Sequence, residues 1–350
     1  MSQQHRASTT PDAPAVSRRT LLGAGGLALA GGTGLLGGAG RAAAAPVRPA
    51  AVSNVGSFDL AAGSSSFLEN KLTTDSHHTM QSFCFDPDNQ RLFTIAQPNG
   101  GTTGQLSVTR LSYAGAVTGH MNLGRLGHGV SMGAERSGTS TFLWTEFDYD
   151  AGADRGRGIQ RFPFVDGGTP KPTYAGNPTA DEGGVNITPS VDHWNRLLGL
   201  KYFVGGSSRF RVYDLDRASA GDFSQVLLQV TQPALAGTFQ GWTIFGSYVY
   251  LLYGDAYDTD KTSRTDNPPP GNTTLSKLNL GTGAYEQGPV HSNAFGSMVS
   301  REPEGMAGYL KADGEHRLYF GFVGHSGTRS TAQPDGIDRP ISIAYKNSFS

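Results

Sequence analysis

The sequence predicts an all-β protein made of repeated pairs of strands. Five segments share one pattern: a short strand, a turn that carries Asp, Gly, Ser or Asn, and a second strand rich in Phe, Tyr, Leu and Val. They are Met80–Gln97, His128–Phe147, Ile187–Phe203, Phe239–Tyr257 and Arg301–Val323. Their first residues are separated by 48, 59, 52 and 62 residues. A period of about 50 residues built only of strands is typical of a propeller, so we expect one five-bladed β-propeller domain over residues 46–350.

The residues between these pairs are expected to supply the outer strands of each blade. Gln105–Tyr113 alternates apolar and polar residues, as a strand with one buried face does. Further outer strands are expected at Ala116–Leu123, Gly158–Val165, Phe210–Leu215, Gln225–Val230, Thr273–Leu280, Ala284–Val290 and Ile341–Lys346. The apolar island Val55–Leu60 is expected to close the ring by completing the last blade. No helix of ordinary length is expected in the propeller.

Three polar segments are expected to be loops: Asp148–Gly158, Asp166–Asn177 and Asp255–Asn272. The last is long, carries three consecutive prolines and would form part of the rim. Two acidic clusters in these loops have the oxygen ligands that calcium prefers: Asp148, Asp150 and Asp154, and Asp255, Asp258 and Asp260. Neither has EF-hand spacing, and solvated loops have the same composition, so we expect no metal site.

The first 45 residues are expected to be an export signal rather than part of the fold. Ser17–Leu22 reads SRRTLL, a twin-arginine motif, and a Gly/Ala/Leu run follows. Small residues at Ala44-Ala45 offer a cleavage site, which predicts a secreted, extracellular protein. Because the apolar run is short and rich in glycine, stable insertion in a membrane is not expected.

Composition excludes several classes of function. The chain has 28 Lys and Arg against 29 Asp and Glu, and loss of the signal removes four bases and one acid, leaving a net charge of −4. No nucleic-acid partner is expected, because nucleic-acid binders carry a basic excess. Cys84 is the single cysteine, so no intrachain disulfide forms; it reads as a buried hydrophobe, with a reactive thiol beside His77 and His78 as the alternative. No nucleotide-binding or zinc-finger motif is present, and no cofactor is expected.

Polar residues at the starts of the inner strands are the candidate site. In a propeller these starts meet at one mouth of the central channel. They are His77, His78, Gln81, His128, Glu182, Asn186, Gln240, Arg301, Glu302 and Glu304. Glu302, Glu304 and His128 are candidate acid–base catalysts. The other groups are candidates for binding hydroxyl or phosphate groups, with Arg301 as the phosphate partner. A structural role for the whole cluster remains open.

Trp144 and Glu146 lie two residues apart in the second pair of strands. An indole beside a carboxylate can make a platform on which a sugar ring stacks. A tryptophan buried in the core is the alternative. Gln240-Gly241-Trp242 carries the same ambiguity.

Several of these segments resemble a known family. MQSFCFD, LGHGVSMG, LWTE, GTFQGW, YLLYGDAY and REPEGMAGY are similar to motifs of the β-propeller of teichoic acid biosynthesis protein C and of phage receptor-binding proteins. The family includes exported actinomycete proteins of the factor C type, which signal in mycelial differentiation and sporulation. The resemblance implies a five-bladed propeller that contacts a cell-wall glycopolymer. Within the matching motifs, it points to Gln81, His128, Trp144, Glu146, Gln240, Arg301, Glu302 and Glu304.

These observations favour a secreted, monomeric propeller that recognises a cell-wall or extracellular glycopolymer, such as a teichoic acid, in a signalling role. Two alternatives remain. The first is an enzyme that cleaves such a polymer as a glycosidase, lyase or phosphodiesterase. The second is a structural or protein-binding propeller whose channel is filled by its own side chains. The sequence leaves open whether the protein is an enzyme.

Overall fold

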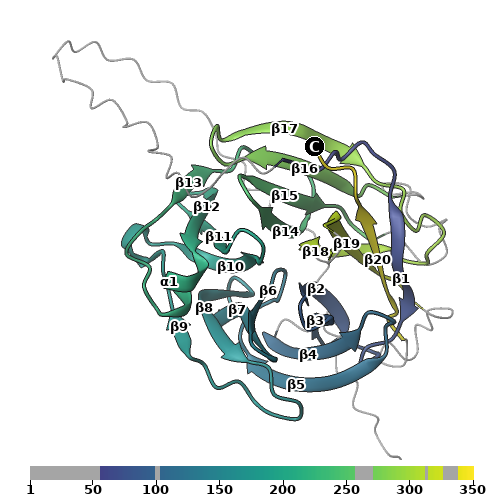
Figure 1. Cartoon of the computed structure of the whole chain (residues 1–350), viewed down its shortest axis with the longest axis horizontal. Helices are drawn as coiled ribbons and strands as arrows, with labels where there is room; N and C mark the ends of the chain where they lie inside the picture. Colours follow the sequence, from purple (N-terminus) through teal and green to yellow (C-terminus); the bar gives the residue numbers. More distant parts are fainter. Residues whose placement is uncertain (1–55, 99–102, 257–270, 312–313, 326–337) are drawn as a thin grey trace, which may run out of the picture. The chain divides into compact units, whose positions relative to one another are not determined.

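The computed structural model describes residues 56–350 with the exception of 99–102, 257–270, 312–313 and 326–337. All described residues belong to the second of two units of the chain, residues 45–350. They form five four-stranded antiparallel sheets. Figure 1 shows the sheets arranged as blades around a central axis. The predicted five-bladed propeller is confirmed.

The five expected pairs of strands are the inner two strands of the five blades. Blade one contains β2 (Thr79–Asp86), β3 (Arg91–Gln97), β4 (Gln105–Ser112) and β5 (Val117–Arg125). Blade two contains β6 (Gly133–Ser137), β7 (Ser140–Asp150), β8 (Arg155–Pro163) and β9 (Tyr174–Gly176). Blade three contains β10 (Val185–Asp192), β11 (Leu197–Val204), β12 (Ser207–Asp214) and β13 (Leu228–Thr231). Blade four contains β14 (Phe239–Phe245), β15 (Tyr248–Tyr253), β16 (Thr274–Asn279) and β17 (Ala284–His291).

The last blade is closed by the N-terminal part of the domain. Its strands are β18 (Glu302–Leu310), β19 (His316–Val323), β20 (Ile341–Lys346) and β1 (Ser65–Lys71), in that order from the axis outward. The expected closing strand was therefore assigned to the wrong segment. Val55 lies outside the described residues, and Phe58 makes only one isolated bridge, to Phe349. Its ring is buried between Phe245, Tyr250 and Phe349, so this apolar segment contributes to the hydrophobic core.

Blade two differs from the sequence prediction in its outer strands. β7 runs on to Asp150 and β8 begins at Arg155, so the loop expected at Asp148–Gly158 is much shorter. The loop expected at Asp166–Asn177 contains β9, the fourth strand of the blade. In the described residues the helices are α1 (Leu215–Ser219) and one 3₁₀ turn (Ala180–Glu182). None of the described helices has the length and apolarity needed to span a membrane.

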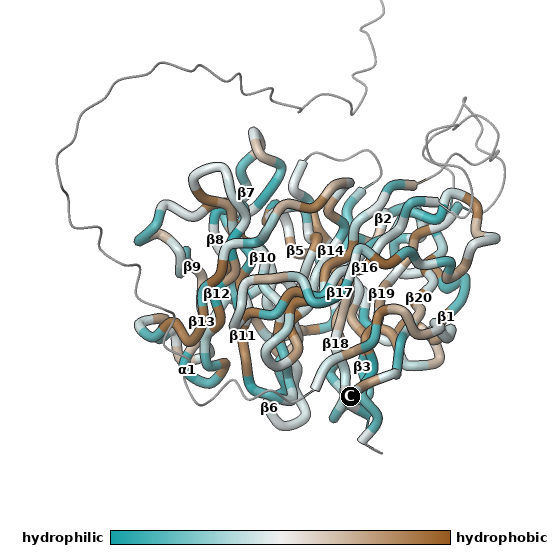
Figure 2. The backbone as a smooth tube through the Cα atoms, turned by 90° about the horizontal axis from the view of Figure 1, so that it is seen from above, coloured by the Kyte–Doolittle hydropathy of each residue, from teal (hydrophilic) through white to brown (hydrophobic). Residues whose placement is uncertain are grey.

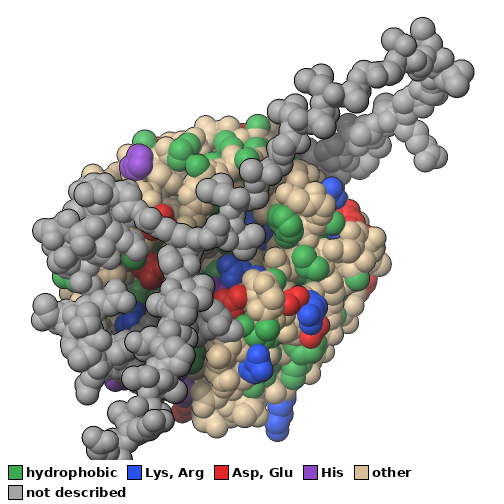
Figure 3. Space-filling model, turned by 180° about the vertical axis from the view of Figure 1, so that it is seen from behind, with side chains coloured by type: hydrophobic (Ala, Val, Ile, Leu, Met, Phe, Trp, Pro, Cys, Tyr) green, Lys and Arg blue, Asp and Glu red, His purple; other side chains and the backbone are tan. Residues whose placement is uncertain are grey.

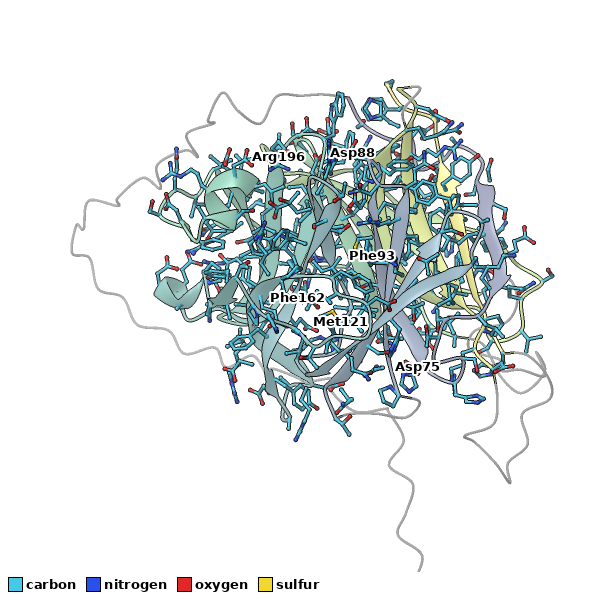
Figure 4. All side chains as sticks on the ribbon, turned by 60° about the horizontal axis from the view of Figure 1, so that its bottom comes forward. Asp75, Asp88, Phe93, Met121, Phe162 and Arg196 are labelled. Carbon is cyan, nitrogen blue, oxygen red and sulfur yellow. The ribbon has the colours of Figure 1, made fainter. Side chains whose placement is uncertain are left out.

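The hydrophobic core lies between neighbouring blades. One cluster joins blades one and two through Phe93, Met121 and Phe162, which Figure 4 shows close together midway along the strands. Similar clusters fill the other four junctions. Figure 2 shows apolar segments concentrated in the strands and polar segments in the connections. Cys84 belongs to this core, and burial raises the pKa of its thiol, so the reading as a buried hydrophobe holds.

The innermost strands meet closely on one side of the ring. A Cβ added at Gly241 would lie 2.8 Å from the Cα of Gly305, and one added at Gly305 would lie 2.5 Å from the Cα of Ser82. Both distances are shorter than real contacts permit. The Ser82 hydroxyl continues the ring by donating a 2.6 Å hydrogen bond to the carbonyl of Gly129. Backbone from blades four, five and one is therefore in contact here, and the Ser82 hydroxyl links blade one to the segment that leads into blade two.

We predict that Gly305→Ala destabilises the protein by about 3 kcal/mol or more. The residue has a φ of +76°, and the added methyl would also meet the Ser82 backbone. Gly138 is the matched control, because its φ is +61° and nothing lies within 4 Å of an added Cβ. Gly138→Ala should cost about 1 kcal/mol, the conformational penalty alone. Denaturant unfolding measures both; equal losses in the two variants would show that the backbone contact is unimportant.

Candidate functional site

The channel has two mouths with different structures. The entry mouth is where the inner strands β2, β6, β10, β14 and β18 begin. The turn mouth is where these strands turn back into the second strands of their blades. Figure 4 shows Asp75, which precedes β2, and Asp88, in the turn after β2, at opposite ends of the strands. The sequence prediction placed the site at the entry mouth.

Trp144 and Glu146 at the entry side have structural roles. The indole of Trp144 is fully buried between blades two and three, and its Nε1 donates to Glu135 Oε2 at 3.1 Å. Glu146 is also fully buried and accepts hydrogen bonds from the backbone N–H groups of Gly129 and Gly156. No ring face of Trp144 is open to a sugar, so the core alternative holds. The carboxylate of Glu146 instead fixes the loop that leads into β6.

Arg301 is likewise fully buried. Its guanidinium donates to the carbonyls of Ala294 (2.7 Å) and Ser292 (2.8 Å) and to the hydroxyl of Thr273 (2.9 Å). The same group stacks over the ring of Phe322, 4.3 Å from its centroid. Arg301 thus ties the segment before β18 to blades four and five, and a phosphate has no access to it.

The two glutamines at this mouth bond to nearby backbone. The amide nitrogen of Gln240 donates to the carbonyl of Gly254 at 3.1 Å, and that of Gln81 lies 3.4 Å from the carbonyls of Thr79 and Met80. Both side chains are buried. Glu304 on β18 is buried as well, while Glu302 is half-buried. None of the four lines the cavity described below.

His77 and His78 lie away from the axis, over blade one. Asp75 contacts three side chains here. Its Oδ2 accepts a hydrogen bond from Ser107 at 2.9 Å and lies 3.0 Å from Nε2 of His120 and 3.5 Å from Nδ1 of His78. Burial lowers the pKa of His78 and outweighs the opposite effect of Asp75. His77 is exposed, with Nδ1 3.7 Å from Asp338. These contacts anchor the loop between β1 and β2 to blade one.

At the entry mouth, both ring nitrogens of His128 lie near polar side chains. Its Nδ1 lies 2.7 Å from Oδ2 of Asp154, whose other oxygen accepts from the Tyr149 hydroxyl at 3.0 Å. Its Nε2 lies 3.3 Å from the amide nitrogen of Gln97. Burial lowers the pKa of His128, although the hydrogen bond to Asp154 opposes this effect. The imidazole is therefore neutral near pH 7, but its two nitrogens already have protein neighbours.

The three aspartates of the first acidic loop do not converge on one point. Asp154 contacts His128, whereas Asp148 and Asp150 face Arg157, 3.6 Å and 3.1 Å from its guanidinium nitrogens. Asp258 and Asp260 lie outside the described residues. Within the described part of the chain, no group of three or more His, Cys, Asp or Glu side chains is arranged to hold a metal ion.

The turn mouth opens into a cavity of about 470 Å³, within the usual size range of small-molecule sites. The turns of blades one, three and five form its rim, through Asp88, through His193 and Trp194, and through Lys311. Trp194 is 59% exposed, the most exposed of the large hydrophobic side chains in the described residues. The deeper wall comes from the inner strands.

The charges at the rim are paired, across blades at Asp88 and within blade five at Lys311. Asp88 Oδ2 lies 2.9 Å from Nη1 of Arg136 and 3.1 Å from Nε2 of His193. Burial favours a higher pKa for Asp88, but these hydrogen bonds outweigh it and hold the pKa below its usual value. Lys311 pairs with Glu315 at 2.9 Å. The rim therefore presents the indole of Trp194 beside both acidic and basic side chains, which are paired with one another.

Sequence reasoning missed Asp88, His193 and Trp194 because it considered only the starts of the inner strands. A signal was present. The turns of blades one and three both read Asp-x-x-Asn, at Asp86–Asn89 and Asp192–Asn195. In each turn the Asp carboxylate accepts from the backbone N–H and the side-chain amide of the Asn. The two central residues of each turn project at the rim, and a Trp at such a position is unusual for a turn.

Comparison with known proteins agrees with this architecture. The family model of the phage 5-bladed β-propeller receptor-binding platform domain matches residues 79–330. The "Putative major teichoic acid biosynthesis protein C" of Bacillus subtilis (strain 168) is 26% identical over 188 residues, which are 50% of this chain and 41% of that protein. The tail fiber of Staphylococcus aureus phage P68 matches with a TM-score of 0.63 and 16% identity, over 81% of this chain and 52% of that chain. The chain thus spans about half, or less, of the length of these two proteins.

These matches confirm the resemblance that the sequence motifs indicate. The tail-fiber match shows the shared fold, since its identity is too low to carry more.

We predict that Arg301→Lys destabilises the protein by about 2–4 kcal/mol. Lysine keeps the charge but cannot reach three acceptors in different directions as the planar guanidinium does. Arg136→Lys is the control, because Arg136 is half-exposed and pairs with Asp88 at the surface. Its loss should stay below about 1 kcal/mol. Thermal and urea unfolding of both variants measure the difference; unchanged stability of Arg301→Lys would free Arg301 for a binding role.

We predict that His128 makes the stability fall as the pH drops below its unfolded pKa of 6.5. Because burial lowers the pKa in the folded state, the unfolded chain takes up a proton there that the folded protein does not. His128→Gln should therefore lose less stability than the wild type between about pH 7.5 and 5.5. His291→Gln, at an exposed histidine, should follow the wild type. Urea unfolding at several pH values tests this, and identical profiles for all three proteins would contradict it.

Proposed function

Because the chain belongs to the family of phage five-bladed β-propeller receptor-binding platform domains, we propose that it recognises a glycopolymer of the cell wall or extracellular matrix. The observation that carries the proposal is the exposed indole of Trp194 at the rim of an open cavity. The teichoic-acid-related name of the Bacillus subtilis protein supports the same class of polymer.

Trp194 is well suited to bind a sugar ring. An indole combines a large apolar face, on which a sugar ring can stack, with one polar N–H that can donate a hydrogen bond. Hydrogen-bond donors and acceptors lie beside this face, on the side chains of His193, Asp88 and Arg136. A hydroxylated ring could stack on the indole while its hydroxyl groups bond to the ion pairs.

Recognition fits the cavity better than cleavage does. Hydrolysis of a glycosidic bond needs two accessible carboxyl groups, one of which is kept protonated. The cavity has two aspartates, and both are committed. Asp88 is ionised and paired with Arg136 and His193. Burial raises the pKa of Asp192, but its oxygens already accept from Asn195 and from the backbone N–H of Gly246.

The charge distribution fits a local rather than a general affinity for anions. Figure 3 shows basic and acidic side chains interspersed over the described part of one face. The whole chain has a net charge of −1, so it has no general excess of positive charge that would attract polyanions from solution. Selectivity would then come from the rim of the cavity.

We further propose that the protein is exported through the twin-arginine signal of residues 1–45 and acts outside the cell. These residues lie outside the described part of the chain, and the support is the SRRTLL motif at Ser17–Leu22. An extracellular signalling role in differentiation, of the factor C type, would follow if polymer binding triggers a response in the producing cell. Deletion of the gene, complemented with wild type or with a binding-deficient variant, tests that role.

We predict that Trp194→Ala weakens binding to isolated cell walls roughly tenfold or more, the effect of losing one stacked aromatic contact of about 1.4 kcal/mol. The measurement is co-sedimentation of purified protein with insoluble walls that retain their teichoic acids and polysaccharides. Soluble fragments are assayed in the same samples, because their accumulation beyond the molar amount of protein would mean that the protein is an enzyme.

Phe203→Ala is the matched control. Phe203 is a second exposed aromatic residue, 40% exposed, on the opposite end of the same hairpin as Trp194. Its removal should leave wall binding unchanged. Binding that survives Trp194→Ala, or that both variants lose equally, would refute the turn mouth as the recognition site.

A further inference from the structure

We propose that the cavity of the turn mouth binds an aliphatic acyl or alkyl chain on a hydroxylated head group, so that its ligand is an acylated sugar or polyol. This inference rests on the proposed function and names the ligand class of the same site. It follows from three features: apolar side chains in the wall of the cavity, a polar rim with an exposed indole, and a closed floor.

Apolar side chains from the inner strands form part of the cavity wall. The wall contains the side chains of Cys84, Met132, Ala134, Val191, Phe245 and Met306. Met132 and Met306 are 3% and 2% exposed, and both are long, unbranched side chains that adapt to the shape of an apolar guest. These residues come from the inner strands β2, β10, β14 and β18 and from β6 with the residues just before it. All five blades therefore contribute apolar surface to one space.

The hydroxyl groups of Ser190 and Thr243 in this wall already have partners within the protein. Ser190 Oγ lies 3.3 Å from Thr243 Oγ1 and accepts from the backbone N–H of Ile244 at 3.2 Å. Thr243 Oγ1 accepts from the backbone N–H of Gly308 at 3.2 Å. A sugar ring placed this deep would lose water from its hydroxyl groups without gaining enough partners. A hydrocarbon chain has no hydroxyl groups to dehydrate, and burying its apolar surface favours binding.

The rim has the opposite character. Asp88, His193 and Lys311 carry charges or hydrogen-bonding groups, and the indole of Trp194 stands beside them in the solvent. A ligand that satisfies both regions must be amphiphilic. Its hydroxylated head would rest against Trp194 while its chain points along the axis into the cavity.

The floor limits the length of the chain. Beyond the cavity, the Ser131 hydroxyl donates to the carbonyl of Pro189 at 2.6 Å, and the backbones at Gly241, Gly305 and Ser82 are in contact. The channel is therefore closed before the entry mouth, and a chain can enter only from the turn mouth. Affinity should rise with chain length until the chain reaches this floor.

A series of n-alkyl β-glucosides, from methyl to octyl and kept below the concentration at which micelles form, tests the inference by calorimetry. Each buried methylene contributes about 0.8 kcal/mol, so each should tighten binding roughly fourfold until a plateau. Affinity that does not change with chain length would overturn the inference.

Variants that fill the cavity give the second test. Ala134→Leu and Val191→Met each place extra carbon atoms in the space and should flatten the chain-length series while the weak binding of methyl glucoside remains. Ala116→Met, at an exposed turn, is the control and should keep the wild-type series. Two filling variants are used so that misfolding of one, checked by circular dichroism, leaves the other. If affinity still rises steeply with alkyl chain length in a correctly folded filling variant, the alkyl chain binds elsewhere and the inference is overturned.

The experiments separate this inference from the proposed function. If walls bind through Trp194 but the glucoside series is flat, recognition stands and the acyl pocket falls. If the series is steep but walls do not sediment the protein, the pocket stands and wall recognition falls. Two further samples distinguish the sources of the chain: walls treated with mild alkali to remove ester-linked acyl groups, and phospholipid vesicles that contain an acylated glycolipid. Lost binding to the treated walls assigns the chain to the wall polymer, and binding to the vesicles assigns it to a membrane glycolipid.

Discussion

The contact between backbones at the entry mouth is the constraint on which the rest of this structure depends. Only glycine at 241 and 305 allows the inner strands of blades four, five and one to approach so closely. Toward the turn mouth the inner strands carry larger side chains, such as Phe245 and Met306, and the cavity lies there. With the backbones in contact at the entry mouth, the turn mouth is the side from which a ligand can enter the channel.

Charged side chains at the closed mouth follow from the same constraint. A buried charge loses its water and persists only where protein groups replace that water. Arg301 with its three oxygen acceptors, and Glu146 with two backbone N–H donors, meet this condition. Such residues hold loops that have no regular hydrogen bonds of their own. In the sequence these residues look like a binding site, because the hydrogen-bonding groups of a loop can pair with a charged side chain as those of a ligand do.

This explains how far the sequence could be used. The repeat of strand pairs and its spacing depend on local alternation of apolar residues, so the five blades and nearly all inner strands were predicted with boundaries close to those observed. The closing strand was placed at Val55–Leu60 because that segment is apolar. An outermost strand faces solvent, however, and the actual strand, Ser65–Lys71, is polar for that reason. Choosing the open mouth depends on contacts between residues from different blades, such as Gly241 with Gly305, which no local pattern contains.

The turn mouth combines a rigid framework with replaceable rim residues. In the Asp-x-x-Asn turns, Asp86 and Asp192 fix the backbone through hydrogen bonds to Asn89 and Asn195, so the two central residues can change without loss of the turn. Blade one presents Pro87 and Asp88 there, and blade three presents His193 and Trp194. A propeller of this kind can therefore alter its ligand by substitutions at a few turn positions while its inner strands stay the same. In the proposed function, the turns would set the binding specificity, while the glycine contacts at the opposite mouth keep the inner strands close together.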